Sequence, residues 1–189
     1  MGRITTQTSD LAQWHDLVKD AEKNNNYYID EEIEFYLICM LQRFIKKPDL
    51  ASSIIALDYL IAQKQIDVNR RKLLQDVGDK CLLFSGLFPE QARKRNVSVS
   101  YFVGLGEAAY YNVASFSRER KDLVELFESL GNHFIELMDL LMCIRELSKE
   151  NSLDLIEAED LWSRTGSKYA LKVIKRYTDG FLIQNFPKQ

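Results

Sequence analysis

The sequence predicts an all-α fold, with one compact domain over residues 1–189 that holds seven or eight helices and one long central helix. Glycine and proline are scarce, at eight and three of 189 residues, which is few for a turn-rich β protein. Apolar residues recur at three- and four-residue steps along most of the chain, as in helices that bury one face. A hydrophobic fraction of 46% and a charged fraction of 28% are typical of a soluble domain of this length.

The first two helices are predicted from their apolar stripes and their ends. The first stripe consists of Leu11, Trp14, Val18 and Ala21. It starts after Ser9 or Asp10 and stops at the asparagine run 24–26, because asparagine favours turns. The second stripe consists of Ile33, Leu37, Met40, Leu41 and Phe44. Asp30 is its predicted cap, and Pro48 follows its end.

The next two helices follow Asp49 and Asp67, and Asp67 is the predicted cap of the second. The stripe of the third helix consists of Leu50, Ile54, Leu57 and Ile61. The stripe of the fourth consists of Leu73, Leu74, Val77, Cys81 and Phe84. Gly86 is expected to end the fourth helix, and Pro89 suits the first position of a short helical turn.

The segment 97–114 allows two interpretations. VSVSYFV alternates like a strand, and Gly104-Leu-Gly106-Glu-Ala-Ala109 fits the G-x-G-x-x-A dinucleotide fingerprint. The alternative is a helix capped by Ser98, and we favour it because the chain contains no other convincing strand. In that helix, Gly104 and Ala108 are expected to let the long helix with Phe127 and Phe134 approach closely. Gly104→Ala is then expected to destabilise the protein.

The C-terminal part continues the helical pattern. The stripe of the long helix, which starts at Ser117, consists of Leu123, Phe127, Leu130, Phe134, Leu137, Leu141 and Ile144. It runs past Gly131, which predicts one long helix bent at that glycine. A further helix is expected over about 153–164, closed by Gly166. A last helix is expected from Ser167 to Tyr177, with Gly180 as its C-terminal cap.

Residues for catalysis or metal binding are few. His15 and His133 are the only histidines, and neither has a metal-ligand partner at a useful spacing. We therefore predict no catalytic residue, no metal and no cofactor. The three cysteines occur without a CxxC motif, which favours reduced core thiols in a cytoplasmic protein. No apolar run approaches the roughly 20 residues of a membrane span.

A candidate binding site lies between the Pro89 turn and the helix that follows it. Its residues are Arg93, Arg95, Tyr101, Glu107, Tyr110 and Tyr111. The arginines could hold an anionic group, and Glu107 with the neighbouring tyrosines could share a helix face. The alternatives are a solvated basic surface and a buried tyrosine hydroxyl that finds its acceptor. If the basic triplet Arg70-Arg71-Lys72 met Arg93-Lys94-Arg95 on one face, the two could hold a phosphate or an acidic partner. The excess of basic residues from Lys64 to Lys121 is too mild to predict a nucleic-acid partner.

The central segment GDKCLLFSGLFPEQARKRNVSVSYFVGLGEAAY, together with Thr165-Gly166-Ser167, resembles a family of uncharacterised bacterial all-helical proteins. That family has a G-D-x-x-L-F-x-G-x-F-P-E segment, then V-x-x-x-Y-[FY]-x-x-[LM]-G-x-x-A-Y. The similarity covers most of the chain beyond about Ala51. It implies a bacterial cytosolic setting and supplies no catalytic residues.

Two functional hypotheses remain. The first is a non-enzymatic helical interaction or regulatory module with a protein partner or a homodimer, because segments such as FYLICMLQRFI are apolar beyond one buried stripe. The second is a small-molecule- or anion-binding protein or enzyme that uses the candidate residues beside the Pro89 turn.

Overall fold

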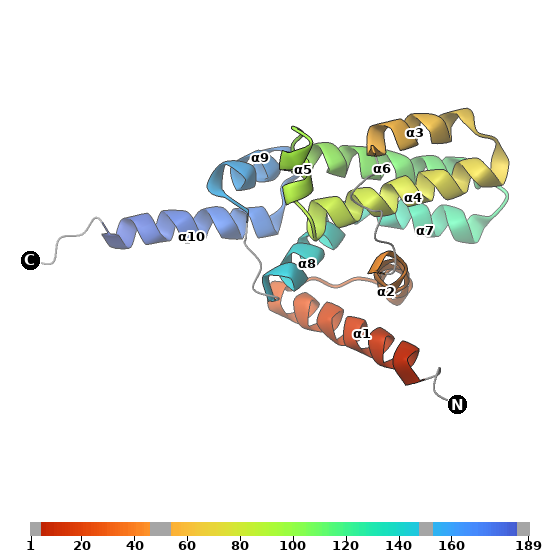
Figure 1. The fold of residues 1–189 in the computed structure, drawn as a ribbon. Coiled ribbons are helices and arrows are strands. Elements are labelled where there is room, and N and C mark those ends of the chain that lie inside the picture. Colours follow the sequence, from red (N-terminus) through yellow and green to blue (C-terminus); the bar gives the residue numbers. More distant parts are fainter. Residues whose placement is uncertain (1–4, 46–53, 148–152, 185–189) are drawn as a thin grey trace, which may run out of the picture.

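Helices form every regular element in the residues that the computed structural model describes, which are 5–45, 54–147 and 153–184 (Figure 1). In chain order the helices are α1 (Thr5–Asn25), α2 (Glu31–Ile45), α3 (Ile55–Lys64), α4 (Asp67–Gly86), α5 (Glu90–Lys94), α6 (Val99–Ser115), α7 (Lys121–Asn132), α8 (Phe134–Leu147), α9 (Leu155–Thr165) and α10 (Lys168–Gln184). The all-α prediction is confirmed. The described residues form ten helices rather than seven or eight; the predicted long helix is divided into α7 and α8, and the turn after Pro89 forms the short helix α5.

Helix α4 lies at the centre, with α6 along one side, α3 above it and α8 across its C-terminal end (Figure 1). Two glycines allow the close contact between α4 and α6. A Cβ atom on Gly78 of α4 would lie 2.5 Å from the ring of Tyr110 on α6. A Cβ atom on Gly106 of α6 would lie 2.8 Å from the Cβ of Cys81 and would overlap the ring of Phe134. Both positions therefore require glycine for packing.

Helix α6 settles the two interpretations of segment 97–114. Ser98 caps it, and the Ser98 hydroxyl accepts a hydrogen bond of 3.2 Å from the backbone N–H of Tyr101. Residues 99–103 are helical, so the strand that a dinucleotide fingerprint needs is absent there. The close contact predicted at Gly104 is wrong, since a Cβ atom there would have no neighbour within 4 Å. The buried glycine is Gly106, two residues and about 200° further around the helix.

The predicted long helix is two helices. His133 leaves helical geometry, with φ of −99° and ψ of 12°, and separates α7 from α8. The bend expected at Gly131 thus lies two residues later. Gly131 is instead a packing position, because a Cβ atom there would come within 2.8 Å of the Tyr111 ring.

Some of the other predicted helix ends are confirmed and others are wrong. Gly166 closes α9 in the left-handed conformation, with φ of 73°, as predicted. Gly180 lies inside α10, so its predicted role as a cap is wrong. Asp67 is the first residue of α4 and not its cap, and α1 begins at Thr5. The residues predicted around Pro48, Asp49 and Leu50 lie outside the described part of the chain.

Helix α3 has an unexpected orientation. It packs mainly on α4 and buries Ile55 and Ala62 there. Leu57 and Ile61 of the predicted stripe remain 50% and 43% exposed, and Ile54, just before the helix, is 65% exposed. The predicted stripe is therefore wrong as a buried face, because its described residues are exposed and the buried side of α3 carries Ile55 and Ala62 instead.

Candidate functional site

A buried carboxylate on α4 joins three helices. Asp79 is completely buried, and its Oδ1 accepts hydrogen bonds from the hydroxyls of Tyr36 on α2, at 2.6 Å, and Tyr110 on α6, at 2.8 Å. Its Oδ2 pairs with the guanidinium of Arg43 on α2. The side-chain amide of Gln75 donates to the Tyr36 oxygen at 3.1 Å. We call these five residues the Asp79 cluster.

Burial dominates the electrostatics of the Asp79 cluster. It raises the pKa of Asp79 to about 6, against the opposing effects of Arg43 and the two tyrosine hydroxyls. Burial and the nearby carboxylate raise the pKa values of Tyr36 and Tyr110 well above the ordinary value, so both phenols remain neutral donors. Asp79 itself has no route to a ligand. Arg43 does reach solvent, because its side chain is 40% exposed.

Arg43 borders an open cleft of about 570 Å³ between the end of α2 and the outer face of α4. The cleft is lined by Arg43, Gln65, Asn69, Lys72, Leu73, Gln75 and Asp76. Lys80 connects its rim to α3, because its ammonium pairs with Asp76 at 2.8 Å and with Asp58 of α3 at 3.0 Å. We call this feature the Arg43 cleft. Its chemistry is polar and cationic, with amide groups on its walls.

A group of exposed apolar side chains lies on the α3–α4 hairpin. Its members, which are 38–73% exposed, are Ile54, Leu57, Leu60, Ile61, Ile66, Val68 and Leu73. On α3, Leu57, Leu60 and Ile61 fall within about 100° of the helix circumference, opposite the buried side. We call these seven residues the hairpin face. Leu73 belongs both to this face and to the Arg43 cleft, so the two features adjoin.

A second buried carboxylate, Asp139 on α8, holds the N-terminus of α10. Its Oδ2 accepts hydrogen bonds from the backbone N–H groups of Lys168 and Tyr169, at 2.8 and 3.1 Å, and from the Tyr27 hydroxyl at 2.6 Å. Its Oδ1 accepts one of 2.5 Å from Ser167. The first free amides of a helix bind anions well, so this cluster fastens α10 to α8. Its four bonds all come from the protein, and it has a structural role.

A charged network joins α1 to α2. Lys19 of α1 pairs with Glu34 of α2 at 2.7 Å and with Glu22 of its own helix at 3.0 Å. His15 Nε2 lies 3.4 Å from the buried Oε1 of Glu34.

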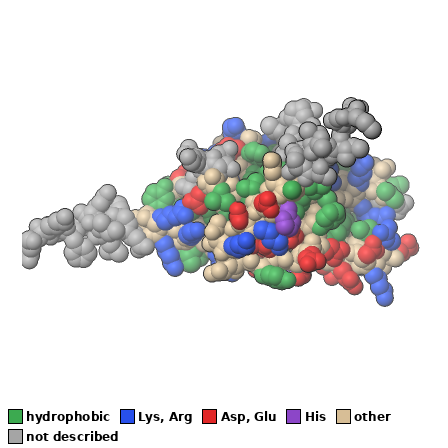
Figure 2. Space-filling view, turned by 90° about the horizontal axis from the view of Figure 1, so that it is seen from below, with side chains coloured by type: hydrophobic (Ala, Val, Ile, Leu, Met, Phe, Trp, Pro, Cys, Tyr) green, Lys and Arg blue, Asp and Glu red, His purple; other side chains and the backbone are tan. Residues whose placement is uncertain are grey.

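On the face seen in Figure 2, basic and acidic side chains of the coloured residues alternate with apolar ones. Such mixed charge differs from the basic stripe of a nucleic-acid-binding surface.

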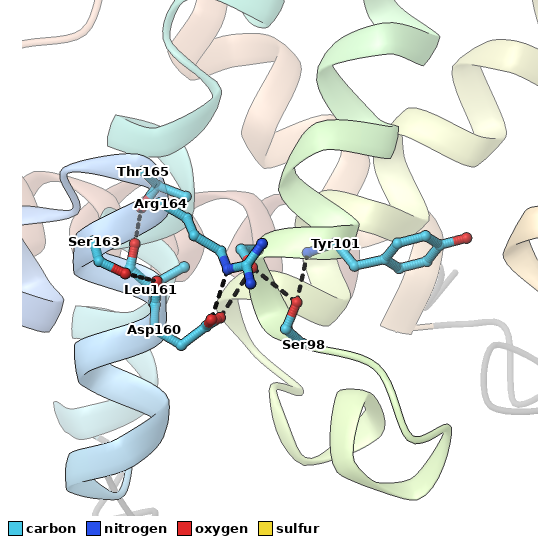
Figure 3. Close-up of polar contacts among 8 residues, drawn as sticks. Ser98, Tyr101, Asp160, Leu161, Ser163, Arg164 and Thr165 are labelled. Carbon is cyan, nitrogen blue, oxygen red and sulfur yellow. Dashed lines mark hydrogen bonds and ion pairs between the residues drawn. The ribbon is translucent and has the colours of Figure 1, made fainter.

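The predicted arginines are occupied by other contacts. Arg93 pairs with Glu157 of α9 at 2.9 Å. The guanidinium of Arg95 lies over the Phe84 ring, 4.8 Å from its centroid, and donates to the Gln91 side chain at 2.6 Å. Ser100 at the start of α6 donates to Asp160 of α9 at 3.0 Å. Asp160 also accepts a hydrogen bond of 2.6 Å from Arg164 of the same helix (Figure 3). These contacts join α5, α6 and α9.

The predicted tyrosines and Glu107 do not converge on one pocket. Tyr110 points inward to Asp79, whereas Tyr111 is exposed and donates to Asn132 at 2.8 Å. Tyr101 is 40% exposed and makes an edge contact with its neighbour Phe102. Glu107 is half-buried, and this burial raises the pKa of its carboxyl. Of the six candidates, only Tyr110 belongs to a buried polar cluster.

Sequence reasoning missed Asp79, Tyr36 and Arg43. One signal was available, because Asp79 is a charged residue between the buried positions Val77 and Cys81 of an apolar stripe. Such a residue requires partners when it is buried. The identity of those partners, on α2 and α6, depends on tertiary contacts.

The cysteines differ in exposure. Cys81 and Cys143 are buried, and burial raises the pKa of both thiols, so the core position predicted for them is confirmed. Cys39 is exposed, which corrects its predicted core position.

Among the described residues, no group of three His, Cys, Asp or Glu side chains is placed to hold a metal ion. The same residues contain no helix that is long and apolar enough to cross a membrane.

The chain matches no protein-family model, no curated protein and no solved structure.

Proposed function

We propose that this protein is a non-enzymatic helical interaction module, and that its hairpin face binds an apolar helix of a partner protein. One observation carries the proposal. Of the 18 large apolar side chains that are exposed in the described residues, seven lie between residues 54 and 73. A concentration of exposed apolar side chains on one helical hairpin is typical of interaction sites.

The arrangement on α3 suits a helical partner. Leu57, Leu60 and Ile61 project from one face at a spacing that matches the i, i+3, i+4 anchors of helix-in-groove recognition. Each of these side chains is about half exposed, so a partner would remove further apolar area from water at about 25 cal/mol per Å².

Charge favours a different protein over a second copy. Residues 54–73 hold four basic and two acidic side chains, a net charge of +2 within a chain whose total is −3. Two copies that meet through this face would place like charges together, which opposes association. We therefore infer a partner helix whose apolar stripe is flanked by Asp or Glu, and a cytoplasmic setting consistent with the three cysteines.

The test begins with selection from a phage-displayed library of random 16-residue peptides. We expect binders with leucine or aromatic residues at helical spacing and with acidic flanks. Leu60→Ser should lower the affinity of such a peptide at least tenfold. Trp162→Ser is the matched control, because Trp162 is an exposed apolar residue on α9, and it should change the affinity less than twofold.

Three results would contradict the proposal. The selected peptides could bind Leu60→Ser as tightly as the unaltered protein, which would place their site elsewhere. They could lack acidic flanks. Light scattering could also show a dimer that Leu60→Ser converts to a monomer, which would make a second copy the occupant of the hairpin face.

A further inference from the structure

The Arg43 cleft borders the hairpin face and has a charge pattern of its own. We propose that it receives a side-chain carboxylate, from Asp or Glu, of the partner helix. This inference rests on the proposed function and specifies the chemistry of the partner. It assigns a recognition role to Arg43 and Lys72, which lie outside the candidate site that the sequence predicted.

Contacts with Asp79 and Phe44 hold the Arg43 side chain in place. It uses Nη2 for the ion pair with Asp79, and its guanidinium lies over the Phe44 ring, 5.1 Å from the centroid. A guanidinium has five N–H donors in a rigid plane, so donors remain for a second acceptor on the side of the cleft. Because Asp79 is buried in the α2–α4–α6 contact, Arg43 is ordered before a ligand arrives. Such preorganisation reduces the entropy lost on binding.

Lys72 supplies the charge that a carboxylate needs. It is exposed and lines the cleft, and no acidic group in the described part of the chain lies within ion-pair distance of its ammonium. Each of the other charges already has a partner within the protein, because Arg43 pairs with Asp79 while Lys80 pairs with Asp76 and Asp58. Lys72 therefore offers a single positive charge, which fits one carboxylate better than a phosphate dianion. The amides of Gln65, Asn69 and Gln75 add hydrogen-bond partners around it.

The position of the cleft favours a carboxylate that is part of a protein. Leu73 belongs to both the cleft and the hairpin face, and Lys80 ties the cleft rim to Asp58 on α3. A helix on the hairpin face would therefore bring a flanking acidic side chain to the cleft. This geometry also explains why charged residues line the border of an otherwise apolar surface.

The experiment uses the peptide selected on the full chain, with a fluorescent label, and measures its affinity by anisotropy at 50 and 200 mM salt. Lys72→Glu should weaken binding at least tenfold at low salt and less at high salt, because screening reduces the charge effect. Lys94→Glu is the matched control, since Lys94 is an exposed lysine on α5, and it should change binding less than twofold. Circular dichroism should show unchanged folding for both variants.

Peptide variants identify the carboxylate. Replacing each acidic residue of the peptide by its amide should reveal one position whose loss weakens binding about tenfold. Placing lysine at that position should restore affinity toward Lys72→Glu and so reverse the preference. These two results together would establish the pairing.

The experiment distinguishes failure of the cleft assignment from failure of the proposed function. If Leu60→Ser weakens binding while Lys72→Glu and every amide peptide bind normally, the cleft assignment is wrong and the proposed function stands. If Leu60→Ser and Lys72→Glu both bind normally, both proposals are wrong. If free N-acetylglutamate displaces the peptide below about 1 mM, which is far tighter than one exposed contact allows, the cleft is a site for a small free carboxylate and the commitment to a protein partner is overturned.

Discussion

Helices α3 and α6 both pack against α4, yet they place their apolar residues in opposite ways. Helix α6 buries its apolar stripe between α4, α7 and α8, and Gly106 allows the backbone to come close. Helix α3 buries only Ile55 and Ala62 and leaves Leu57 and Leu60 at least half exposed. An apolar stripe thus indicates that a helix needs a partner, and it does not say whether that partner belongs to the same chain.

The polar contacts of these two helices differ as well. Tyr110 of α6 donates to the buried Asp79, so α6 is joined to α4 and α2 inside the core. Asp58 of α3 pairs with Lys80 at the partly exposed rim of the Arg43 cleft. A side chain removed from α6 should therefore affect stability, whereas one removed from the outer face of α3 should affect binding.

The largest expected effect is at Gly106. Gly106→Ala should lower the free energy of unfolding by about 3 kcal/mol, at the upper end of the usual cost of overpacking, because the new Cβ overlaps the buried Phe134 ring and crowds Cys81. Urea denaturation followed by circular dichroism measures this change. A loss below about 1 kcal/mol would mean that α6 moves easily relative to α8, and would weaken the contrast with α3.

The next effect concerns the pH dependence of the Asp79 cluster. Because burial raises the pKa of Asp79 to about 6, the folded protein binds this proton more tightly than the unfolded chain. Asp79 therefore favours folding as the pH falls through 6, and this contribution is lost as the pH rises. Between pH 5 and 7 it amounts to about 1 kcal/mol.

The measurement compares urea denaturation at pH 5 and pH 7 for the unaltered protein and Asp79→Asn. The variant lacks the titrating group, while Arg43, Tyr36, Tyr110 and Asp76 remain around the position. Its stability should fall less, by about 1 kcal/mol, than that of the unaltered protein as the pH rises from 5 to 7. Equal pH dependence in both proteins would show that Asp79 stays ionised over this range.

Gly104 is the exposed counterpart of Gly106. Gly104→Ala should raise the free energy of unfolding by about 0.5–1 kcal/mol, because the site is exposed, a Cβ atom meets nothing within 4 Å, and alanine is the better helix former. This result reverses the effect expected from the sequence. A lower melting temperature for the variant would restore a packing role for Gly104.

The smallest effect is expected on α3. Leu60→Ser should change the free energy of unfolding by less than about 0.5 kcal/mol, because Leu60 is 58% exposed and has little buried area to lose. Leu82→Ser is the matched control, since Leu82 is completely buried in α4, and it should cost more than about 3 kcal/mol. Similar losses for both variants, measured by thermal denaturation, would show that the hairpin face is covered in solution.

Helix positions could be predicted from the sequence because they depend on local signals. Ser98 caps α6, and Gly166 closes α9 in a left-handed conformation that glycine adopts without strain. Gly180 fits the same local pattern, yet it lies inside α10 and does not end the helix. Glycine inside a helix costs only about 1 kcal/mol, so one glycine is a weak stop signal.

The candidate site depended on tertiary contacts and was largely missed. Asp79 lies 43 residues from Tyr36 and 31 residues from Tyr110, so no local pattern connects them. The predicted arginines are engaged by Glu157 and by the Phe84 ring, contacts that likewise require the folded arrangement. The choice between Gly104 and Gly106 was equally out of reach, because both fit the same local pattern and only the neighbouring helices distinguish them.

The most direct test of the interaction function is to locate the bound peptide by NMR. Backbone amide spectra of the ¹⁵N-labelled full chain, recorded during titration with the selected acidic peptide, should change most at residues 54–73. Residues of α6 and α9 should change little. Changes centred on the Pro89 turn and on Tyr101–Tyr111 would contradict the assignment of the hairpin face and would support the alternative binding site.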